Sequence, residues 1–477
     1  MILAAAGLLL PIVAVCLALF ALRLRDARDS APLTLAISIG GGLGLASVLT
    51  FWCVSLGLPI GSRFALLDAV IWTAIGAVAV WTLRRNSADG RTSQASVAGS
   101  SPLTMDDWLV RGAFWLVAAS AVATVVAHYV ASPHGEWDAW AIWNLKARFL
   151  VRDTDPWTTM LAVRWSQPSH PFFVSLSVAR LWGYAGSELT IVPATLGLVW
   201  GIGIVTAVMG ALDTRRRRAW IAGSVLIAPA TFTQLVAAQT ADLAVGLFVV
   251  ATLIMVRRAI SGSALDSGQI RISLLLAAVL GSLGAWTKNE GVLLMLITTV
   301  ILAWTMRRRQ WARSMAWWVA GAVPVCLTLL WFKLAIAPVA PAYIAESPGA
   351  ASLLQRLFDP ARHAVVADAI GWRWLEWGGP MARGVLPLMI VAAVAAVFTR
   401  AGRAAGAVLV ALGVMFAAYY AIWILSPLDT SWLVSTTFDR LLIQLWPSLV
   451  LTAFSAGAAA EPSSASPAVV APAGARG

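Results

Sequence analysis

The thirteen residues EWDAWAIWNLKAR, numbered 136–148, guide the interpretation of the rest of this chain. They follow an apolar segment, residues 108–131, that is long enough to cross a lipid bilayer. Where that segment would return to water, the stretch combines three tryptophans with two carboxylates, Glu136 and Asp138. Tryptophans suit a membrane interface, whereas carboxylates at that depth are costly unless they have a partner or a task. The stretch is therefore either an interfacial anchor with incidental charges or part of a functional site.

The composition excludes an ordinary soluble domain. The chain has 477 residues, of which 60% are hydrophobic and 12% charged, whereas soluble domains carry about 25% charged residues. Its net charge of +12 comes from arginines that cluster at the ends of apolar runs. That placement is typical of membrane topology and not of nucleic-acid binding, so we expect no nucleic-acid partner. The three cysteines form no CxxC pair, which argues against a disulfide framework or a zinc knuckle.

Apolar runs of membrane-spanning length recur along the chain, and they predict an all-α polytopic membrane protein with about thirteen spans. We expect these spans near residues 2–22, 33–57, 64–83, 108–131, 189–211, 219–237, 241–257, 272–287, 290–306, 315–337, 384–399, 404–425 and 441–457. If they alternate in direction, the basic clusters all fall on one side. The positive-inside rule makes that side cytoplasmic and the N-terminus external. We expect the membrane to be the inner (plasma) membrane.

Polar, small-residue stretches divide the predicted spans into groups. Residues 1–83 form an N-terminal three-helix membrane segment, and residues 84–107 a cytoplasmic linker that is rich in Ser and Gly. Residues 108–457 form the main transmembrane module, and residues 458–477 a disordered cytoplasmic tail. Outside the membrane we expect a long loop at 132–188 and a second at 338–383. Within the first loop, residues 174–184 are too short to span and predict a helix lying on the outer face.

The first candidate site residues are the two carboxylates of the opening stretch. Either Glu136 or Asp138 could act as a general base toward a hydroxyl acceptor or as a metal ligand. A structural salt bridge from Asp138 to Lys146 or Arg148 is the alternative. We favour a functional role for Asp138, and we place Glu136 and Lys146 among the candidate substrate-binding residues.

His170 lies next to Pro171 in the segment WSQPSHPFF, residues 165–173, which holds it in an extended backbone. It could bind a metal or a phosphate, although an isolated histidine is more often a polar surface residue. Glu136, Asp138 and His170 are thus the candidate ligands for a possible divalent metal; no other cofactor is expected.

Three further candidate groups lie at predicted outer turns. Asp242 begins a span, and with Asp138 it is a candidate catalytic residue. Capping of its helix is the alternative and could coexist with a role in the substrate site. Lys288 and Glu290 are candidate substrate-binding residues. Lys288 could hold a phosphate as a point charge, and the alternative is a weak surface pair between the two. Arg440 enters the last span from outside, where its guanidinium could clamp a lipid phosphate or simply reach the interface beside Asp439.

The spans themselves are nearly free of charge, with Asp68 and Lys333 expected to reach the interface from span ends. A carrier or channel needs ionisable groups near the membrane midplane, so this pattern argues against transport. No Gly-rich phosphate loop, Gly-x-Ser-x-Gly elbow or His-Glu-x-x-His motif is present.

The order of these elements resembles the membrane-embedded glycosyltransferases of the GT-C fold, the superfamily of protein O-mannosyltransferases and the lipid A aminoarabinose transferase. The shared order runs from about residue 108 to 451: a span, an acidic outer loop with Asp138, a His-Pro-Phe-Phe segment, a basic span end, a turn with Asp242, and a Thr-Lys-x-Glu-Gly turn at 287–291. The resemblance implies that Asp138 is the catalytic base and that Asp242 matches the turn aspartate. Many members have an acidic or basic residue and paired prolines where this chain has Ser169-His170-Pro171-Phe172, so metal binding is not carried over.

Together these features predict an inverting glycosyltransferase that moves a sugar from a polyprenyl-phosphate carrier to a protein, lipid or glycan acceptor on the outer face. Membrane lipid would then be a partner as well. The alternatives are a lipid or glycan transporter or flippase, and a non-catalytic membrane scaffold of the same fold.

Overall fold

The computed structural model describes residues 1–22, 31–88, 104–153, 155–261, 267–306, 311–338, 349–399 and 402–455. In these ranges the chain forms helices and no strand, which confirms an all-α polytopic membrane protein. The N-terminal part of the chain, up to Ala185, forms α1 (Ile2–Ala21), α2 (Ala31–Ser55), α3 (Ser62–Ala88), α4 (Met105–Ala131), η1 (Ala139–Trp143), α5 (Asn144–Arg152), α6 (Pro156–Leu161) and α7 (Phe173–Ala185). The remaining helices are α8 (Ile191–Ala211), α9 (Arg217–Ile227), α10 (Ala230–Ala237), α11 (Asp242–Ile260), α12 (Ser267–Thr287), α13 (Asn289–Thr305), α14 (Trp311–Trp331), η5 (Phe332–Ile336), α15 (Gly349–Leu357), α16 (Pro360–Glu376), η6 (Pro380–Ala382), α17 (Val385–Val397), α18 (Gly402–Leu425) and α19 (Thr430–Ser455).

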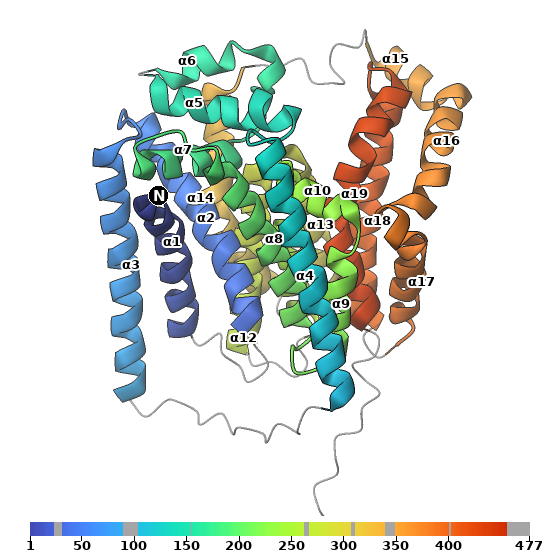
Figure 1. Cartoon of the computed structure of the whole chain (residues 1–477), viewed down its shortest axis with the longest axis horizontal. Coiled ribbons are helices and arrows are strands. Elements are labelled where there is room, and N and C mark those ends of the chain that lie inside the picture. The colour runs from blue at the N-terminus through green and yellow to red at the C-terminus, as the bar shows by residue number, and fades with distance from the viewer. Residues whose placement is uncertain are drawn as a thin grey trace, which may run out of the picture.

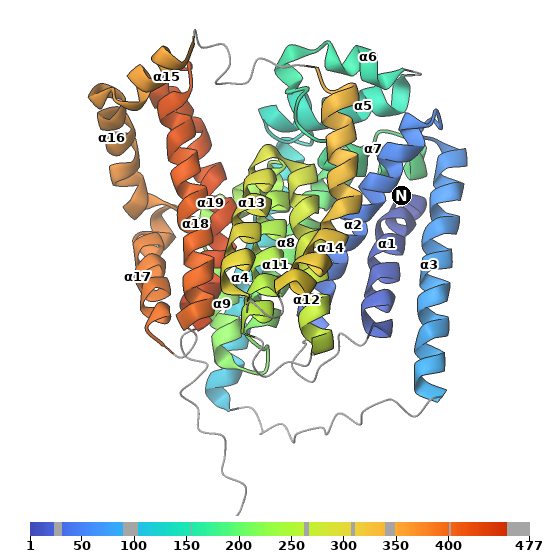
Figure 2. The ribbon, with the colours of Figure 1, turned by 180° about the vertical axis from the view of Figure 1, so that it is seen from behind.

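The long helices run roughly side by side and the short ones gather at one end (Figure 1). Helix α11 is the central element. In its most apolar stretch 83% of the residues are buried, and it packs against α8, α12 and α19. Seen from behind, α12, α13 and α14 cover this centre, while α15 to α18 form one flank (Figure 2). We call the end that carries α5, α6 and α15 the loop end.

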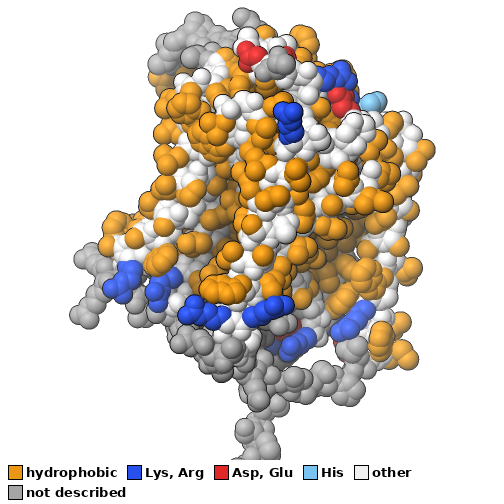
Figure 3. All heavy atoms as spheres, turned by 90° about the vertical axis from the view of Figure 1, so that its left-hand side faces the viewer, with side chains coloured by type: hydrophobic (Ala, Val, Ile, Leu, Met, Phe, Trp, Pro, Cys, Tyr) orange, Lys and Arg blue, Asp and Glu red, His pale blue; other side chains and the backbone are white. Residues whose placement is uncertain are grey.

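The opposite end carries the basic clusters that the structure describes. Arg84 and Arg85 lie in the last turns of α3, Arg217 begins α9, and Arg257 lies in the last turn of α11. On one face of the molecule the lysine and arginine side chains gather at this end, below a broad apolar band (Figure 3). Alternating spans would place them together in this way. The side of the membrane that this end faces stays a prediction.

The predicted spans all appear as helices, but they differ in kind. Among the described residues, nine helices are long and apolar enough to cross a membrane, and a tenth span results if the bent pair α9 and α10 is counted as one. That pair bends by 67° at its break, beside Pro229, whose ring cannot donate an N–H to a helix interior. Helices α13 and α17 are shorter, with 17 and 13 residues. Helix α19 begins at Thr430, well before the predicted start at residue 441.

Helix α7 is buried inside the protein, which corrects the prediction that it lies on the outer face. Every residue from Phe173 to Tyr184 is buried, because α7 packs against α1, α2, α5 and α8. The cause is a polar residue at its centre. Arg180 forms a buried ion pair with Asp68 of α3 and donates from Nη1 to the Gly7 carbonyl of α1 at 2.7 Å. Asp68 is 1% exposed, so its carboxylate is held inside the protein; its depth in the membrane stays a prediction.

The N-terminal three helices pack onto the rest of the bundle. Helix α2 contacts α8 and α12, and the hydrophobic core runs without interruption from α2 to α19. Helix α3 extends through Ala88, and α4 begins at Met105 after a capping box formed by Thr104 and Asp107. Residues 89–103 of the predicted linker and residues 456–477, which include the predicted tail, lie outside the described residues.

Candidate functional site

The segment that carries Asp138 is held against the end of α10. After α4 the chain turns at Gly135, which has a φ of +73°, and a side chain there would meet the Ala238 carbonyl oxygen at 2.8 Å. The Glu136 N–H then donates to that same carbonyl at 3.3 Å. Asp138 follows at the start of η1, and its side chain is about one-fifth exposed. The glycine is therefore required for the close approach that places Asp138 beside the turn leading to α11.

Asp242 lies at the first position of α11, with its side chain 1% exposed. It forms no helix-capping hydrogen bond. Its carboxylate instead accepts hydrogen bonds from Lys288 Nζ at 3.0 Å, Arg440 Nε at 2.9 Å and Gln444 Nε2 at 2.9 Å. Three donors from two separate elements satisfy the buried charge, as burial of a carboxylate requires. The side chain therefore belongs to a polar network and does not serve as a helix cap.

Arg440 joins the two aspartates. It lies inside α19, and its Nη2 is 2.5 Å from Asp138 Oδ2 while its Nε bonds to Asp242. At the other end of the network, Lys288 Nζ also pairs with Glu290 Oε1 at 2.9 Å. These contacts connect five residues in the order Asp138, Arg440, Asp242, Lys288, Glu290, which we call the ion-pair chain. The carboxylates at its two ends are partly exposed, and the one at its centre is buried. The predicted Lys288–Glu290 pair is thus present, whereas Asp439 pairs with Arg373 at 3.9 Å and not with Arg440.

The electrostatics of Lys288 follow from this arrangement. Burial acts to lower the pKa of its ammonium group, but attraction to Asp242 and Glu290 outweighs burial, so its pKa is raised above the usual value. Lys288 is therefore a fixed cation at neutral pH. Two fixed cations, Lys288 and Arg440, are held close to one buried carboxylate and two partly exposed ones.

His170 lies near the ion-pair chain and close to the lysines Lys146, Lys288 and Lys333. Its ring stacks on Trp143 with centroids 6.0 Å apart, and its Nδ1 accepts a long hydrogen bond of 3.4 Å from Asn289 Nδ2. Lys333 Nζ donates to the Asn289 side-chain oxygen at 3.1 Å and to the Ser169 carbonyl. Burial, and then the charges of Lys146 and the other nearby lysines, hold the His170 pKa well below its usual value. The imidazole is therefore neutral at pH 7.

Lys146 is fully buried, and its ammonium group does not contact Asp138. Its Nζ donates to the Gln167 carbonyl at 2.7 Å and lies over the rings of Trp143 and Phe172. Burial, with a smaller contribution from Lys333, lowers its pKa to about 7. Lys146 thus supports the segment that precedes His170 rather than forming the structural salt bridge to Asp138. Arg148, the other proposed partner, pairs with Glu188 at 3.4 Å.

Glu136 points away from the ion-pair chain. Its carboxylate is more than half exposed and lies 3.2 Å from His128 Nε2 at the end of α4. The predicted substrate-binding role of Glu136 is therefore not supported by its position. The reason is the turn of backbone at η1, which sends residues two apart to different sides. Within the described ranges, no group of three or more His, Cys, Asp or Glu side chains could hold a metal ion, so the proposed set of Glu136, Asp138 and His170 is not assembled.

The structure adds residues that the sequence analysis did not select. Gln444 and Tyr419 extend the network around Asp242, with the Tyr419 hydroxyl donating to Gln444 Oε1 at 2.8 Å, and Asn289 links His170 to Lys333. A glutamine in the apolar run of α19 was a detectable signal, because a polar side chain in a membrane helix needs a partner. The ammonium group of Lys333, which we expect near the interface, bonds to the Asn289 side chain beside His170.

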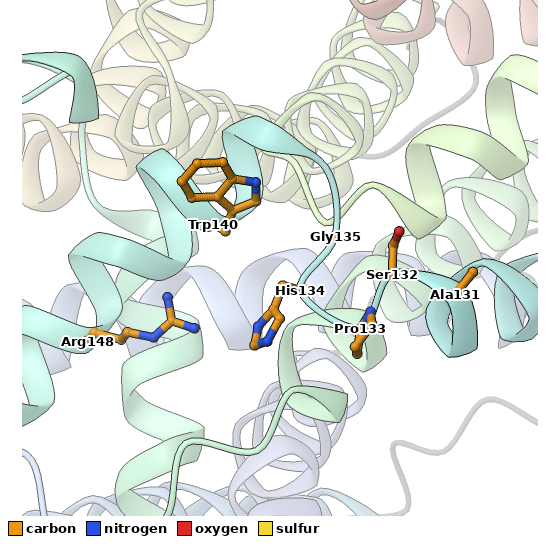
Figure 4. A pocket seen from close by; sticks show the side chains of 7 residues that line it. All are labelled: Ala131, Ser132, Pro133, His134, Gly135, Trp140 and Arg148. Carbon is orange, nitrogen blue, oxygen red and sulfur yellow. The ribbon is translucent and has the colours of Figure 1, made fainter.

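A shallow pocket of about 600 Å³ opens on another side of the same segment. Trp140, His134 and Arg148 surround it, together with the chain from Ala131 to Gly135 (Figure 4). None of the five residues of the ion-pair chain lines it. We therefore place the candidate site at the ion-pair chain, because ionisable groups brought together from four segments carry chemistry that a shallow surface pocket does not.

Comparisons with protein-family models, with curated proteins and with solved structures find no match for this chain.

Proposed function

We propose that this protein is an inverting glycosyltransferase that moves a sugar from a polyprenyl-phosphate carrier to an acceptor hydroxyl at the loop end. The single observation that supports the proposal most is the ion-pair chain itself. It combines a partly exposed carboxylate, Asp138, with two fixed cations, Lys288 and Arg440, at the end of an apolar helical bundle. A base and a phosphate-holding cation pair are the two functions that this transfer requires.

In the proposed reaction the acceptor oxygen attacks the anomeric carbon as the bond from that carbon to the phosphate oxygen breaks. The bonding electron pair leaves with the phosphate, and the acceptor proton goes to Asp138. A single displacement inverts the anomeric centre. Among the described residues, no hydrogen bond to Asp138 Oδ1 is found, so this oxygen is available for the proton while Oδ2 pairs with Arg440.

The leaving phosphate gains negative charge during the step, and cations held in a water-poor site stabilise that charge most strongly. Lys288 and Arg440 are kept in position by the buried Asp242, so little reorganisation is needed when the phosphate arrives. The polyprenyl tail would lie along the apolar helices, and the loop end would face the periplasm or the exterior of a bacterial inner membrane. This arrangement agrees with the resemblance to GT-C enzymes.

The test is transfer by the purified full chain from a panel of radiolabelled polyprenyl-phosphate sugars, with and without a chelator. Wild-type protein should transfer at least one sugar, and Asp138→Asn should abolish transfer with unchanged expression. Asp155→Asn is the matched control, because this exposed carboxylate only accepts a hydrogen bond from Thr158 at 2.7 Å. Full activity of Asp138→Asn would remove this residue from the mechanism, and loss of activity on chelation would add a metal to it.

A further inference from the structure

A second, polar pocket of about 220 Å³ lies on the other side of α19 from the ion-pair chain. Arg440 points into the ion-pair chain, whereas the preceding residue, Asp439, lines this pocket. The pocket is bordered by α10, the end of α16, the glycines that follow it and α19, and its polar lining residues are Thr231, Gln234, Arg373, Glu376 and Asp439. Because consecutive helical residues point about 100° apart, one helix serves both sites.

The backbone around the pocket is built for close approach. Gly378 and Gly379 have φ values of +90° and +85°, and the Gly378 carbonyl accepts the N–H of Ala230 at 2.8 Å. A side chain on Gly378 would meet the Pro229 ring at 2.8 Å. Two glycines in the left-handed region therefore join the end of α16 to the start of α10, where α9 and α10 break.

Two features of the lining concern the hydrogen bonding of its polar groups among the described residues. Trp377 is 2% exposed, and its indole N–H has no acceptor among the described residues, which is a costly state for a buried donor. Arg373 Nη1 and Asp439 Oδ2 stand 3.9 Å apart, beyond hydrogen-bond distance. A hydroxyl group could bridge this separation by accepting from Arg373 and donating to Asp439.

The size and chemistry of the pocket select the ligand class. Its volume is below the roughly 300–1,000 Å³ of sites for drug-sized ligands, so it suits a small molecule. An indole, an amide, two carboxylates and a guanidinium offer donors and acceptors to several hydroxyl groups at once. We propose that this pocket binds one sugar ring and determines which sugar is used. The identification of the ligand as a sugar rests on the proposed function.

The position of the pocket relates it to the transfer step. Gln234 lies one helical turn before Ala238, whose carbonyl accepts the Glu136 N–H of the segment that carries Asp138. The pocket is therefore bounded by α19, which carries Arg440, and by α10, whose end contacts the segment that carries Asp138. The ring belongs to either the donor or the acceptor, since both carry the same hydroxyl chemistry.

The first experiment measures sugar binding without transfer. Full-length protein in detergent is titrated with methyl glycosides of hexoses and pentoses, and binding is followed by saturation-transfer NMR. At least one glycoside should bind wild type, and Gln234→Leu and Trp377→Phe should each weaken its affinity by about tenfold or more. Trp372→Phe is the matched control, because Trp372 lies on α16 but is 73% exposed and does not line the pocket.

Binding of no glycoside, or equal binding by all variants, would overturn the inference. Binding that depends on Gln234 and Trp377 in a protein that transfers no sugar would support the pocket and reject the proposed function. Where transfer occurs, a raised KM for the donor lipid in these variants assigns the ring to the donor, and a raised KM for the acceptor assigns it to the acceptor. An unchanged KM for both substrates would also contradict the inference.

Discussion

Asp138 and Asp242 share one guanidinium, since Arg440 reaches the first through Nη2 at 2.5 Å and the second through Nε at 2.9 Å. The two aspartates come from different loops, and the arginine from the last helix. The two contacts use two different nitrogens of the planar guanidinium, an arrangement that the single nitrogen of a lysine ammonium does not reproduce.

Replacing Arg440 by lysine should therefore lower kcat/KM for sugar transfer by about 100-fold, because the positive charge is kept but one of the two contacts that fix its position is lost. Arg152→Lys is the matched control, since Arg152 pairs with Glu188 on the exposed surface. A transfer assay with both variants checks this. Near-normal activity of Arg440→Lys would show that simultaneous contact with both aspartates through two guanidinium nitrogens is not needed.

Asp242→Asn should destabilise the fold more than Asp138→Asn does. Asp242 is almost fully buried and satisfies two cations, whereas Asp138 is one-fifth exposed. Removing one partner of a buried ion pair typically costs about 3–5 kcal/mol. Thermal unfolding in detergent measures the difference. Equal midpoints for the two variants would mean that Asp242 is not the centre of the network.

The buried pair between Asp68 and Arg180 should hold the N-terminal helices to α7. Asp68 also accepts from the Tyr184 hydroxyl at 2.7 Å and from Trp72 Nε1 at 3.2 Å. Asp68→Leu and Arg180→Met should each cost about 3–5 kcal/mol, and the double variant should cost much less than the sum. A double-mutant cycle of thermal stability tests this. Additive losses would indicate that the two charges do not act as a pair.

The stability of the protein should rise with pH through the titration of Lys146. Its pKa is about 7 in the folded protein, against an ordinary value of 10.5. Between these values the unfolded chain binds more protons than the folded one, so folding becomes more favourable as pH increases. The gain is at most about 1.4 kcal/mol per pH unit and is lost as pH falls to 7.

The check for Lys146 is to compare wild type with Lys146→Met from pH 7 to pH 9. The variant removes the titrating group and keeps a long side chain, so it should lack this rise. Parallel stability curves for the two proteins would show that the ammonium group is not held in a low-dielectric site.

Glu136→Gln should leave sugar transfer within about twofold of wild type, because an exposed pair with His128 contributes little energy. The comparison with Asp138→Asn, two positions away, separates the roles of the two carboxylates in the same assay. A large loss of transfer in Glu136→Gln would return this residue to the substrate site.

Much of the membrane architecture was predictable from local composition. Span positions depend on runs of apolar residues, whereas the break at Pro229 was not predicted within the span 219–237. Individual polar residues at the loop end were also identifiable, because a charge next to an apolar run is unusual. Asp138, Asp242, Lys288, Glu290 and Arg440 were all selected in this way, and the structure brings all five into one chain of contacts.

Which of these charges meet one another depends on the tertiary structure. Glu136 and Asp138 have the same charge and are two positions apart, yet the turn into η1 sends one to His128 and the other to Arg440. Likewise Arg180 and Asp68 look like separate interfacial charges until α7 is packed between α1 and α3. A membrane span depends on a run of consecutive apolar residues, which is visible in the sequence, so the sequence determined where the helices are. Ion pairing acts through space between helices far apart in sequence, so only their packing decided which residues form the site.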